Sequence, residues 1–313
     1  MPTPYAYLRK QIVPLAEAKI GVMTHAFNYG TGVFEGIRGN WNADDESIYL
    51  FRPEDHFRRL TASGKILRID IGHSVDEMVD LTKRLVEMSG FREDIYVRPL
   101  AYKSSEVVGV RLHDLEDDLL IFVSPFGPYF DTDKGIRCQT SSWRRVDDVS
   151  IPARAKVTGI YVNSALAKTE AQLNGFDEAI MLNQDGHVSE GSGENIAIIR
   201  HGRLITPARS DNILEGITLS TVCELAVKEL GIEVIERTID RSELYIADEV
   251  LMTGTAAHVS AVIEVDRRTV GDGATGAITK RLQALYFQAI TGRLPKYASW
   301  STPVSMRQAI RQG

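Results

Sequence analysis

The sequence predicts an α+β fold with two domains and a mixed or antiparallel sheet. With 313 residues, 43% hydrophobic and 25% charged, the chain is long enough for two domains. Its apolar runs are short and separated by turn signals, which is typical of strands joined by hairpins. No dinucleotide-binding glycine fingerprint follows a predicted strand. These observations favour an α+β fold over a doubly wound parallel sheet.

Residues 1–123 are expected to form a small N-terminal domain of strands and helices. Pro53 marks the first turn of one helix, because its fixed φ suits that position. Ser74 and Glu77 form the capping box of a second helix. The segment 94–104 is rich in β-branched and aromatic residues, which predicts a strand.

Residues 124–135 concentrate Pro, Gly and Asp, which predicts the interdomain loop. Residues 136–313 are expected to form a larger C-terminal domain. Within it, apolar periodicity predicts helices near 160–173, 217–230 and 276–292, and short strands lie between them.

Composition excludes several classes of protein. The net charge of −6 argues against a nucleic-acid surface, and two isolated cysteines are too few for a disulfide framework or a metal site. The N-terminal residues carry no apolar signal core, and no apolar run reaches the length of a membrane span. We therefore expect no membrane partner and, by default, a cytoplasmic location.

The most informative motif surrounds Glu190. A turn signal at 183–186 predicts a hairpin whose returning strand carries Glu190, and Gly191 and Gly193 then let the backbone approach a bulky group. A buried carboxylate together with a reactive lysine, such as Lys156, suits an aldehyde cofactor with a basic ring nitrogen, such as pyridoxal phosphate. A glycine-rich surface hairpin with a solvated Glu remains the alternative.

Two features could bind a phosphate. Ile217 and Thr218 lie at the N-terminus of a predicted amphipathic helix, where free amides favour an anion. Arg58 and Arg59 are adjacent on another predicted helix, so only one can readily face inward. An ordinary capped helix and a solvated arginine pair are the alternatives.

A turn of small residues and an aromatic wall could bind a substrate. Successive amides of Thr255, Ala256 and Ala257 could receive a carboxylate, although a turn needed only for packing would look similar. Strand alternation sends two sets of side chains to shared faces, and ordinary sheet residues are again the alternative. These sets are Phe34, Gly36 and Arg38, and Tyr96 with Arg98.

Six blocks occur together in one order: YGTGVFEGIR, YVRPL, AKVTGIYVNS, GHVSEGSGEN, LEGIT and ADEVLMTGTAA. In this combination the chain resembles the class IV aminotransferases, pyridoxal-phosphate enzymes of fold type IV. The resemblance runs over nearly the whole chain and is strongest to the branched-chain amino acid aminotransferases. It implies transfer of an amino group between branched-chain L-amino acids (Leu, Ile, Val) and 2-oxoglutarate.

The resemblance implies a role for each matching residue. Lys156 is the expected catalytic residue, which holds the cofactor aldehyde as a Schiff base and moves the proton, and Glu190 rather than Glu194 pairs with the ring nitrogen. The remaining expected cofactor ligands are Arg59, Tyr161, Leu214, Ile217, Thr218 and Thr255. The expected substrate-binding residues are Tyr29, Phe34, Gly36, Arg38, Tyr96, Arg98, Val110, Phe126, Tyr129, Ala256 and Ala257. Because Tyr29 and the loop 107–110 reach across from a partner subunit in the family, a homodimer or a higher oligomer of dimers is implied.

Two departures from the family pattern affect the substrate pocket. Phe126 occupies a place where relatives often carry Trp, and the segment 104–118 differs in length and content from that of common bacterial members. Alternatives within the family are therefore D-amino acid aminotransferase, (R)-selective amine transaminase and aminodeoxychorismate lyase. Outside it, a non-catalytic phosphate-binding module or a structural interaction protein would leave Lys156 without a role.

Overall fold

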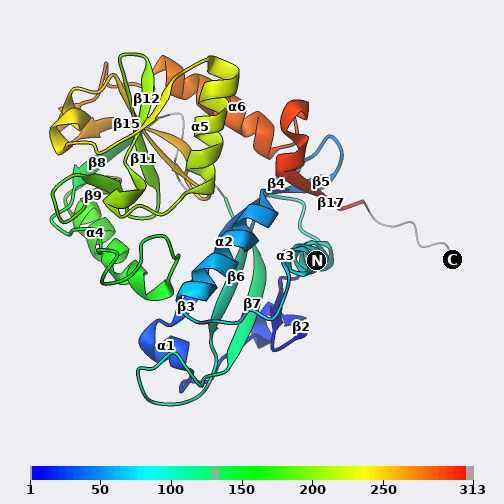
Figure 1. Ribbon diagram of the computed structural model, residues 1–313. Coiled ribbons are helices and arrows are strands. Elements are labelled where there is room, and N and C mark those ends of the chain that lie inside the picture. The colour runs from blue at the N-terminus through cyan, green and yellow to red at the C-terminus, as the bar shows by residue number, and fades with distance from the viewer. Residues whose placement is uncertain (1, 128–129, 131–133, 308–313) are drawn as a thin grey trace. The chain divides into compact units, whose positions relative to one another are not determined.

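The computed structural model describes residues 2–127, 130 and 134–307, which divide into two compact units (Figure 1). Unit 1 comprises Met1–Gly127, Ala155–Gly159 and Gln288–Gly313, and unit 2 comprises Pro128–Arg154 and Ile160–Phe287. The boundaries expected from the sequence put everything after residue 135 in one C-terminal domain. The chain instead returns to unit 1 twice.

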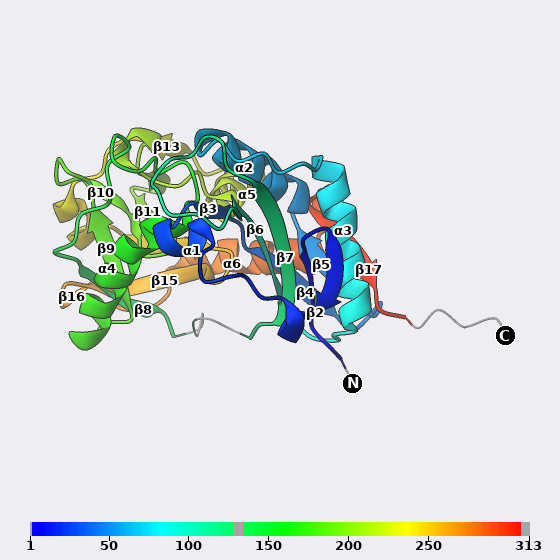
Figure 2. The same cartoon turned by 90° about the horizontal axis from the view of Figure 1, so that it is seen from below.

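Unit 1 is built on an eight-stranded sheet with the strand order β17-β5-β4-β6-β7-β1-β2, in which β3 also pairs with β6. Its described strand pairs are all antiparallel, and Figure 2 shows the long strands β6 and β7 side by side. The strands are β1 (Tyr5–Leu8), β2 (Gln11–Pro14), β3 (Gly32–Phe34), β4 (Ile37–Asn42), β5 (Ser47–Phe51), β6 (Ile95–Lys103), β7 (Asp117–Pro125) and β17 (Ser301–Ser305). Because β17 pairs with β5 along its whole length, the C-terminal segment belongs to unit 1.

Two helices pack on this sheet, α2 (Pro53–Ile66) against β3 and β6, and α3 (Val75–Ser89) against β1 and β7. The predicted capping box of α3 is confirmed: Glu77 N donates to Ser74 Oγ over 3.2 Å, and Ser74 N donates to Glu77 Oε2 over 2.7 Å. Unit 1 also contains α1 (His25–Tyr29) and the 3-10 helices η1 (Leu15–Glu17) and η5 (Pro295–Trp300).

The predicted strand through residues 34–38 is interrupted, because β3 ends at Phe34 and β4 begins at Ile37. The register against β6 nevertheless continues across the gap, with Phe34 opposite Leu100 and Ile37 opposite Val97. The predicted alternation of side chains therefore holds. Phe34, Gly36 and Arg38 lie on one face of the sheet and Glu35 lies on the other.

Unit 2 is built on a nine-stranded mixed sheet with the order β10-β9-β8-β15-β14-β11-β12-β13, in which β16 also pairs with β15. Its strands are β8 (Ile136–Thr140), β9 (Glu178–Leu182), β10 (Val188–Gly191), β11 (Asn195–Arg200), β12 (Arg203–Thr206), β13 (Val234–Glu236), β14 (Glu249–Gly254), β15 (His258–Val265) and β16 (Arg268–Thr269). Strand β8 is parallel to both β9 and β15, while β14 is antiparallel to its neighbours. The mixed sheet predicted from the sequence is confirmed.

In unit 2, α4 (Tyr161–Leu173) packs against β8 and β9, and α5 (Ile217–Leu230) packs against β13 and β14. A third helix, α6 (Ala277–Ile290), begins in unit 2 and ends in unit 1. The 3-10 turn η2 (Thr158–Ile160) begins in unit 1 and ends in unit 2, and the turns η3 (Arg209–Asp211) and η4 (Arg241–Tyr245) lie in unit 2. Among the described residues, no helix has the length and apolar character needed to cross a bilayer, and no cluster of His, Cys, Asp and Glu could hold a metal ion.

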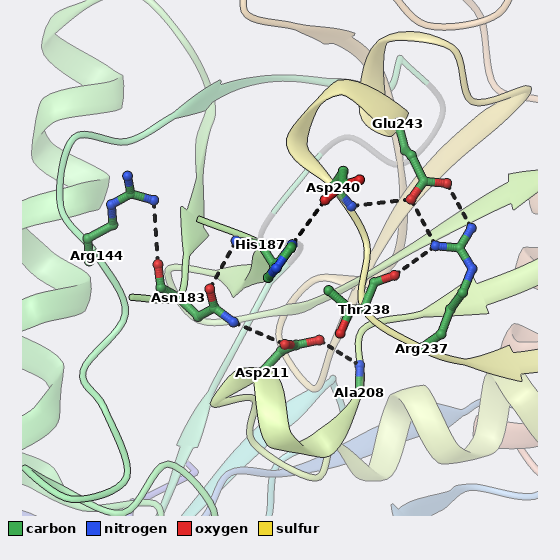
Figure 3. Close-up of polar contacts among 9 residues, drawn as sticks. All are labelled: Arg144, Asn183, His187, Ala208, Asp211, Arg237, Thr238, Asp240 and Glu243. Carbon is green, nitrogen blue, oxygen red and sulfur yellow. Dashed lines mark hydrogen bonds and ion pairs between the residues drawn. The ribbon is translucent and has the colours of Figure 1, made fainter. Parts of the chain in front are cut away.

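A polar network surrounds the turn between β9 and β10 (Figure 3). Asn183 Nδ2 donates to Asp211 Oδ1 over 3.0 Å, and the Asn183 side-chain oxygen accepts from His187 N over 2.9 Å. The hairpin predicted at 183–186 is confirmed, with β9 and β10 antiparallel. The network ties this hairpin, which carries Glu190, to the segment that leads to Leu214.

Candidate active site

Lys156 is held through its backbone to two elements of unit 1. Its amide donates to Ser63 Oγ of α2 over 3.2 Å, and its carbonyl accepts from Phe34 N of β3 over 3.0 Å. Two residues further on, Thr158 Oγ1 donates to the carbonyl of Gly30 over 2.8 Å. These bonds fix the Lys156 backbone, so that only its side chain remains to be oriented.

The aromatic ring of Phe34 is contacted by two cations. Lys156 Nζ lies 5.1 Å and the Arg98 guanidinium carbon 4.5 Å from its centroid. Arg98 also lies 5.0 Å from the Tyr96 ring and donates from Nη2 to the Tyr96 hydroxyl over 2.9 Å. Arg98 Nε is buried and has no hydrogen-bond partner. The predicted shared face of Tyr96 and Arg98 is therefore confirmed, and it places a cation beside the Lys156 amine.

Arg38 has a different environment on the same face. It is 4% exposed, and its guanidinium donates to Asp94 Oδ2 over 3.1 Å and to the Gly127 carbonyl over 3.3 Å. The ring of Phe126 lies 5.0 Å away. These contacts fix the position of the Arg38 side chain beside the Phe126 ring.

Gly36 leaves room for the Tyr96 side chain. A Cβ atom at Gly36 would lie 2.1 Å from the Tyr96 hydroxyl oxygen. This close approach explains why residue 36, between β3 and β4, is glycine.

Arg59 faces inward and its neighbour Arg58 outward, as the sequence predicts, with exposed fractions of 14% and 65%. Arg59 donates from Nε and Nη2 to the two oxygens of Glu35, which is fully buried and also lies 2.7 Å from His56 Nδ1. Burial raises the pKa of Glu35, but the charge and hydrogen bonds of Arg59, with those of His56, lower it to about 2. Burial lowers the pKa of His56. The cluster is thus an ionised Glu35 that orients Arg59.

Glu190 is a buried carboxylate of unit 2 with donors at both of its oxygens. It is 5% exposed, and its Oε2 accepts from Asn195 Nδ2 and from the Leu214 amide, each over 2.9 Å. Arg145 Nη2 lies 2.8 Å from Oε1. These donors satisfy an ionised carboxylate in a buried position.

Glu194 has the opposite character. Its Oε2 accepts from the Gly193 amide within the same turn, over 3.1 Å. Burial and the neighbouring charge of Glu178 raise the pKa of the Glu194 carboxyl. Glu194 therefore favours its neutral form, and this supports Glu190 as the charged group.

The N-terminus of α5 has no side-chain cap and no acidic residue in its first turn. Gly216 precedes it, and a Cβ atom there would lie 1.8 Å from Asn195 Oδ1. Glycine at this position lets Asn195 reach both Glu190 and the carbonyl of Leu214, the latter over 2.8 Å. Asn195, which donates to Glu190, therefore packs closely against Gly216 at the start of α5.

The turn between β14 and β15 consists of the predicted small residues, Thr255, Ala256 and Ala257. A hydrogen bond stabilises the end of this turn: Ser260 Oγ donates to the Ala257 carbonyl over 2.7 Å.

The remaining predicted site residues lie elsewhere. Tyr161 is the first residue of α4, and Tyr29 is the last residue of α1. The Val110 side chain is 85% exposed, and Tyr129 lies outside the described residues.

The predicted residues fall in both units. Unit 1 brings together Lys156, Phe34, Gly36, Tyr96 and Arg98, and unit 2 brings together Glu190 and Leu214. The prediction that Lys156 and Glu190 contact opposite ends of one cofactor stays a prediction. Sequence reasoning missed the partners of these groups, Glu35, His56, Arg145 and Asn195. Glu35 and Asn195 lie inside quoted blocks, but no sequence signal marks Arg145.

The residues fit pyridoxal phosphate in their chemistry. An amine, a buried carboxylate with several donors, an inward-facing arginine and an uncapped helix N-terminus match the aldehyde, the ring nitrogen and the phosphate of this cofactor.

Comparison with known proteins agrees with this chemistry. The family model described as amino-transferase class IV matches residues 32–265. A probable branched-chain-amino-acid aminotransferase of Aquifex aeolicus (strain VF5) is 51% identical over 300 residues, which cover 96% of each chain.

Two solved structures are similar over nearly the whole chain. The branched-chain aminotransferase of Thermoproteus uzoniensis with norvaline is 43% identical, with a TM-score of 0.90, over 96% of this chain and 99% of that one. The branched-chain amino acid aminotransferase of Thermobaculum terrenum in its PLP-form (holo-form) is 38% identical, with a TM-score of 0.92, over 97% of this chain and 99% of that one. The family match and these likenesses agree over most of the length, and the chain belongs to the class IV aminotransferases, the pyridoxal-phosphate enzymes of fold type IV.

Proposed function

We propose that this chain transfers the amino group between branched-chain L-amino acids and 2-oxoglutarate, with pyridoxal phosphate as its cofactor. The similar proteins of Aquifex aeolicus and Thermoproteus uzoniensis carry the branched-chain aminotransferase name, and the latter was solved with norvaline. The observation in this chain that carries the proposal is the Phe34 ring, which lies against both Lys156 Nζ and Arg98.

Phe34 and Arg98 give the two kinds of contact that the reaction needs. An aromatic wall suits the aliphatic side chain of leucine, isoleucine or valine. The second substrate, 2-oxoglutarate, carries a carboxylate where leucine carries methyl groups, so a cation must lie within reach of the same position. Of the two arginine candidates, Arg98 suits this task better, because the Arg38 guanidinium already forms an ion pair with Asp94 and donates to the Gly127 carbonyl.

The cofactor supplies a ring that accepts the electrons released at the substrate Cα. We assign Lys156 Nζ to its aldehyde, to the removal of the Cα proton and to the delivery of a proton to the cofactor carbon. Glu190 would accept a hydrogen bond from the protonated ring nitrogen, with Arg145 and Asn195 keeping Glu190 ionised and oriented. Tyr161 would donate to the phenolic oxygen of the ring.

The phosphate would be bound by Arg59, by the amides of Ile217 and Thr218 at the start of α5, and by Thr255. Leu214 would pack on the ring. The amides of Ala256 and Ala257 would receive the α-carboxylate of the substrate.

We further propose that the chain acts as a homodimer or a higher oligomer of dimers. Exposed apolar side chains gather on α1, on the turn before it and on the loop between β6 and β7, and α1 and this loop contact each other. They include Val22 (80% exposed), Phe27 (68%), Val108 (80%) and Val110 (85%). A patch of this kind is typical of an interface between subunits. A cytoplasmic location is also part of the proposal, and fractionation of the source cells would test it.

A donor panel tests the reaction. The purified protein is given L-leucine, D-alanine or (R)-1-phenylethylamine with 2-oxoglutarate, and formation of glutamate is measured. We expect turnover to be fastest with L-leucine. Faster turnover of D-alanine or of the amine would favour the D-amino acid aminotransferase or the (R)-selective amine transaminase of the same fold.

A further inference from the structure

The loop between β6 and β7 is held at one residue, Gly109, by two side chains of α1. His25 Nε2 lies 2.7 Å from the Gly109 carbonyl oxygen, and the Gly109 amide donates to the Tyr29 hydroxyl over 3.0 Å. Figure 1 shows this loop passing beside α1. Both polar groups of the Gly109 backbone are therefore bound by side chains from one short helix.

The hydrogen bonds of His25 define which ring nitrogen carries the proton. A carbonyl oxygen only accepts, so Nε2 must donate to Gly109. In a neutral imidazole Nδ1 then accepts, and the Thr31 hydroxyl lies 2.7 Å from it. His25 is fully buried, and its ring lies 4.7 Å from the ring of Tyr29. The imidazole is thus a fixed link between the body of unit 1 and the loop.

The loop itself carries little else that could fix its tip. Its base is bound to α1 through the His25 amide, which donates to the Ser105 carbonyl over 2.9 Å, and through a bridge between Thr24 and Glu106. Gly109 has a φ of +139°, which side-chain-bearing residues rarely adopt. The flanking Val108 and Val110 are 80% and 85% exposed. Their positions depend on how firmly Gly109 is held.

We infer that His25 is a positioning residue for substrate specificity. By donating to Gly109 it holds the two valines where they can contact the side chain of an apolar substrate, without touching the substrate itself. This inference rests on the proposed function, and on the substrate-binding role that the resemblance to the branched-chain aminotransferases implies for Val110.

Two substitutions of His25 separate its hydrogen bonds from its volume. His25→Phe keeps a ring beside Tyr29 and removes both bonds. His25→Gln keeps an amide donor near the position of Nε2 and serves as the conservative rescue. Hydrogen exchange of the peptide 104–111 reports on the loop, and KM and kcat are measured for L-leucine and L-glutamate.

In His25→Phe we expect faster exchange of the loop and a KM for L-leucine that rises about 3- to 10-fold, the loss expected for one hydrogen bond. The kcat and the cofactor content should stay within twofold of the unsubstituted enzyme. In His25→Gln, the exchange rate of the loop and the KM for L-leucine should both return most of the way to the values of the unsubstituted enzyme. Val110→Ala, a change at an exposed site, should by itself raise the KM for L-leucine.

The controls separate two kinds of failure. If Val110→Ala leaves the KM for L-leucine unchanged, the proposed role of the loop fails and the inference fails with it. If Val110→Ala raises that KM but His25→Phe does not, the inference alone is overturned, whether or not exchange becomes faster. If His25→Phe raises the KM for L-leucine and for L-glutamate equally and also lowers the melting temperature, His25 has a merely structural role. That result would also overturn the inference.

Discussion

Arg59 and Glu35 meet edge to edge: Arg59 Nε lies 2.6 Å from Glu35 Oε1, and Arg59 Nη2 lies 2.7 Å from Glu35 Oε2. This paired geometry fixes the plane of the guanidinium as well as its position. The same carboxylate is bound by His56, and its side chain is fully buried. The arginine that we assign to the cofactor phosphate is thus oriented before any ligand arrives.

Replacing Glu35 tests the energetic part of this relationship. Glu35→Gln should lower the free energy of unfolding by about 3–5 kcal/mol, because it leaves the mostly buried Arg59 charge without its carboxylate partner. Urea denaturation of the cofactor-free protein measures the change. Asp80→Asn, which breaks the exposed pair of Asp80 and Lys83, is the matched control and should cost at most about 1 kcal/mol. Equal effects of the two substitutions would contradict the account.

The same pair predicts a pH dependence. Burial raises the pKa of Glu35, but Arg59 and His56 lower it to about 2 from its ordinary value of 4.5. A carboxyl with a lowered pKa stabilises the fold above its unfolded-state pKa, and that stability is lost as the pH falls through the folded-state pKa. The stability difference between the unsubstituted protein and Glu35→Gln should therefore be constant above about pH 5 and shrink between 4.5 and 2. A difference that does not change with pH would show that the charge of Glu35 is not what stabilises.

Two neighbouring carboxyl groups, Glu190 in β10 and Glu194 in the turn after it, should differ in their importance for catalysis. Glu190→Gln should lower kcat about 100- to 1,000-fold with the cofactor retained, because an amide cannot balance a protonated ring nitrogen. Glu194→Gln should keep kcat within about tenfold, since burial beside Glu178 raises the pKa of Glu194 and favours its neutral form. Single-turnover kinetics with L-leucine compare the two. A larger loss in Glu194→Gln would reverse the assignment.

Arg98 should distinguish the two substrates. In Arg98→Leu the KM for L-glutamate should rise about 10- to 100-fold, the expected cost of a lost hydrogen bond to a charged group. The KM for L-leucine should change much less, because leucine has no second carboxylate. Arg38→Leu should instead lower the melting temperature, since it unpairs Asp94. Steady-state kinetics with both donors would contradict the role of Arg98 if the two KM values rose equally.

Much of the fold could be predicted because local signals agreed with the final structure. The capping box at Ser74, the turn at 183–186 and the helix 217–230 each depend on neighbouring residues, and each lies where the sequence places it. The division into units could not be predicted in this way. Strand β17 belongs to unit 1 because it pairs with β5, about 250 residues earlier, and no local pattern announces such a pairing.

The candidate site, too, could be predicted only where local patterns were enough. Tyr96 and Arg98 could be grouped by strand alternation, since side chains two apart share a face, whereas Phe34 joins them only through the pairing of β3 with β6. The partners of the charged groups could not be found, because Arg145 reaches Glu190, and Arg59 reaches Glu35, only through tertiary packing. Periodicity shows which face a residue occupies, but not which charge lies opposite.

The most direct test of the account is the site of cofactor attachment. The purified enzyme with pyridoxal phosphate is reduced with borohydride, digested, and examined by mass spectrometry, with Lys156→Ala treated in parallel. We expect the phosphopyridoxyl group on Lys156, and neither label nor transamination in the variant. Labelling of a different lysine, or turnover of L-leucine by Lys156→Ala, would contradict the account.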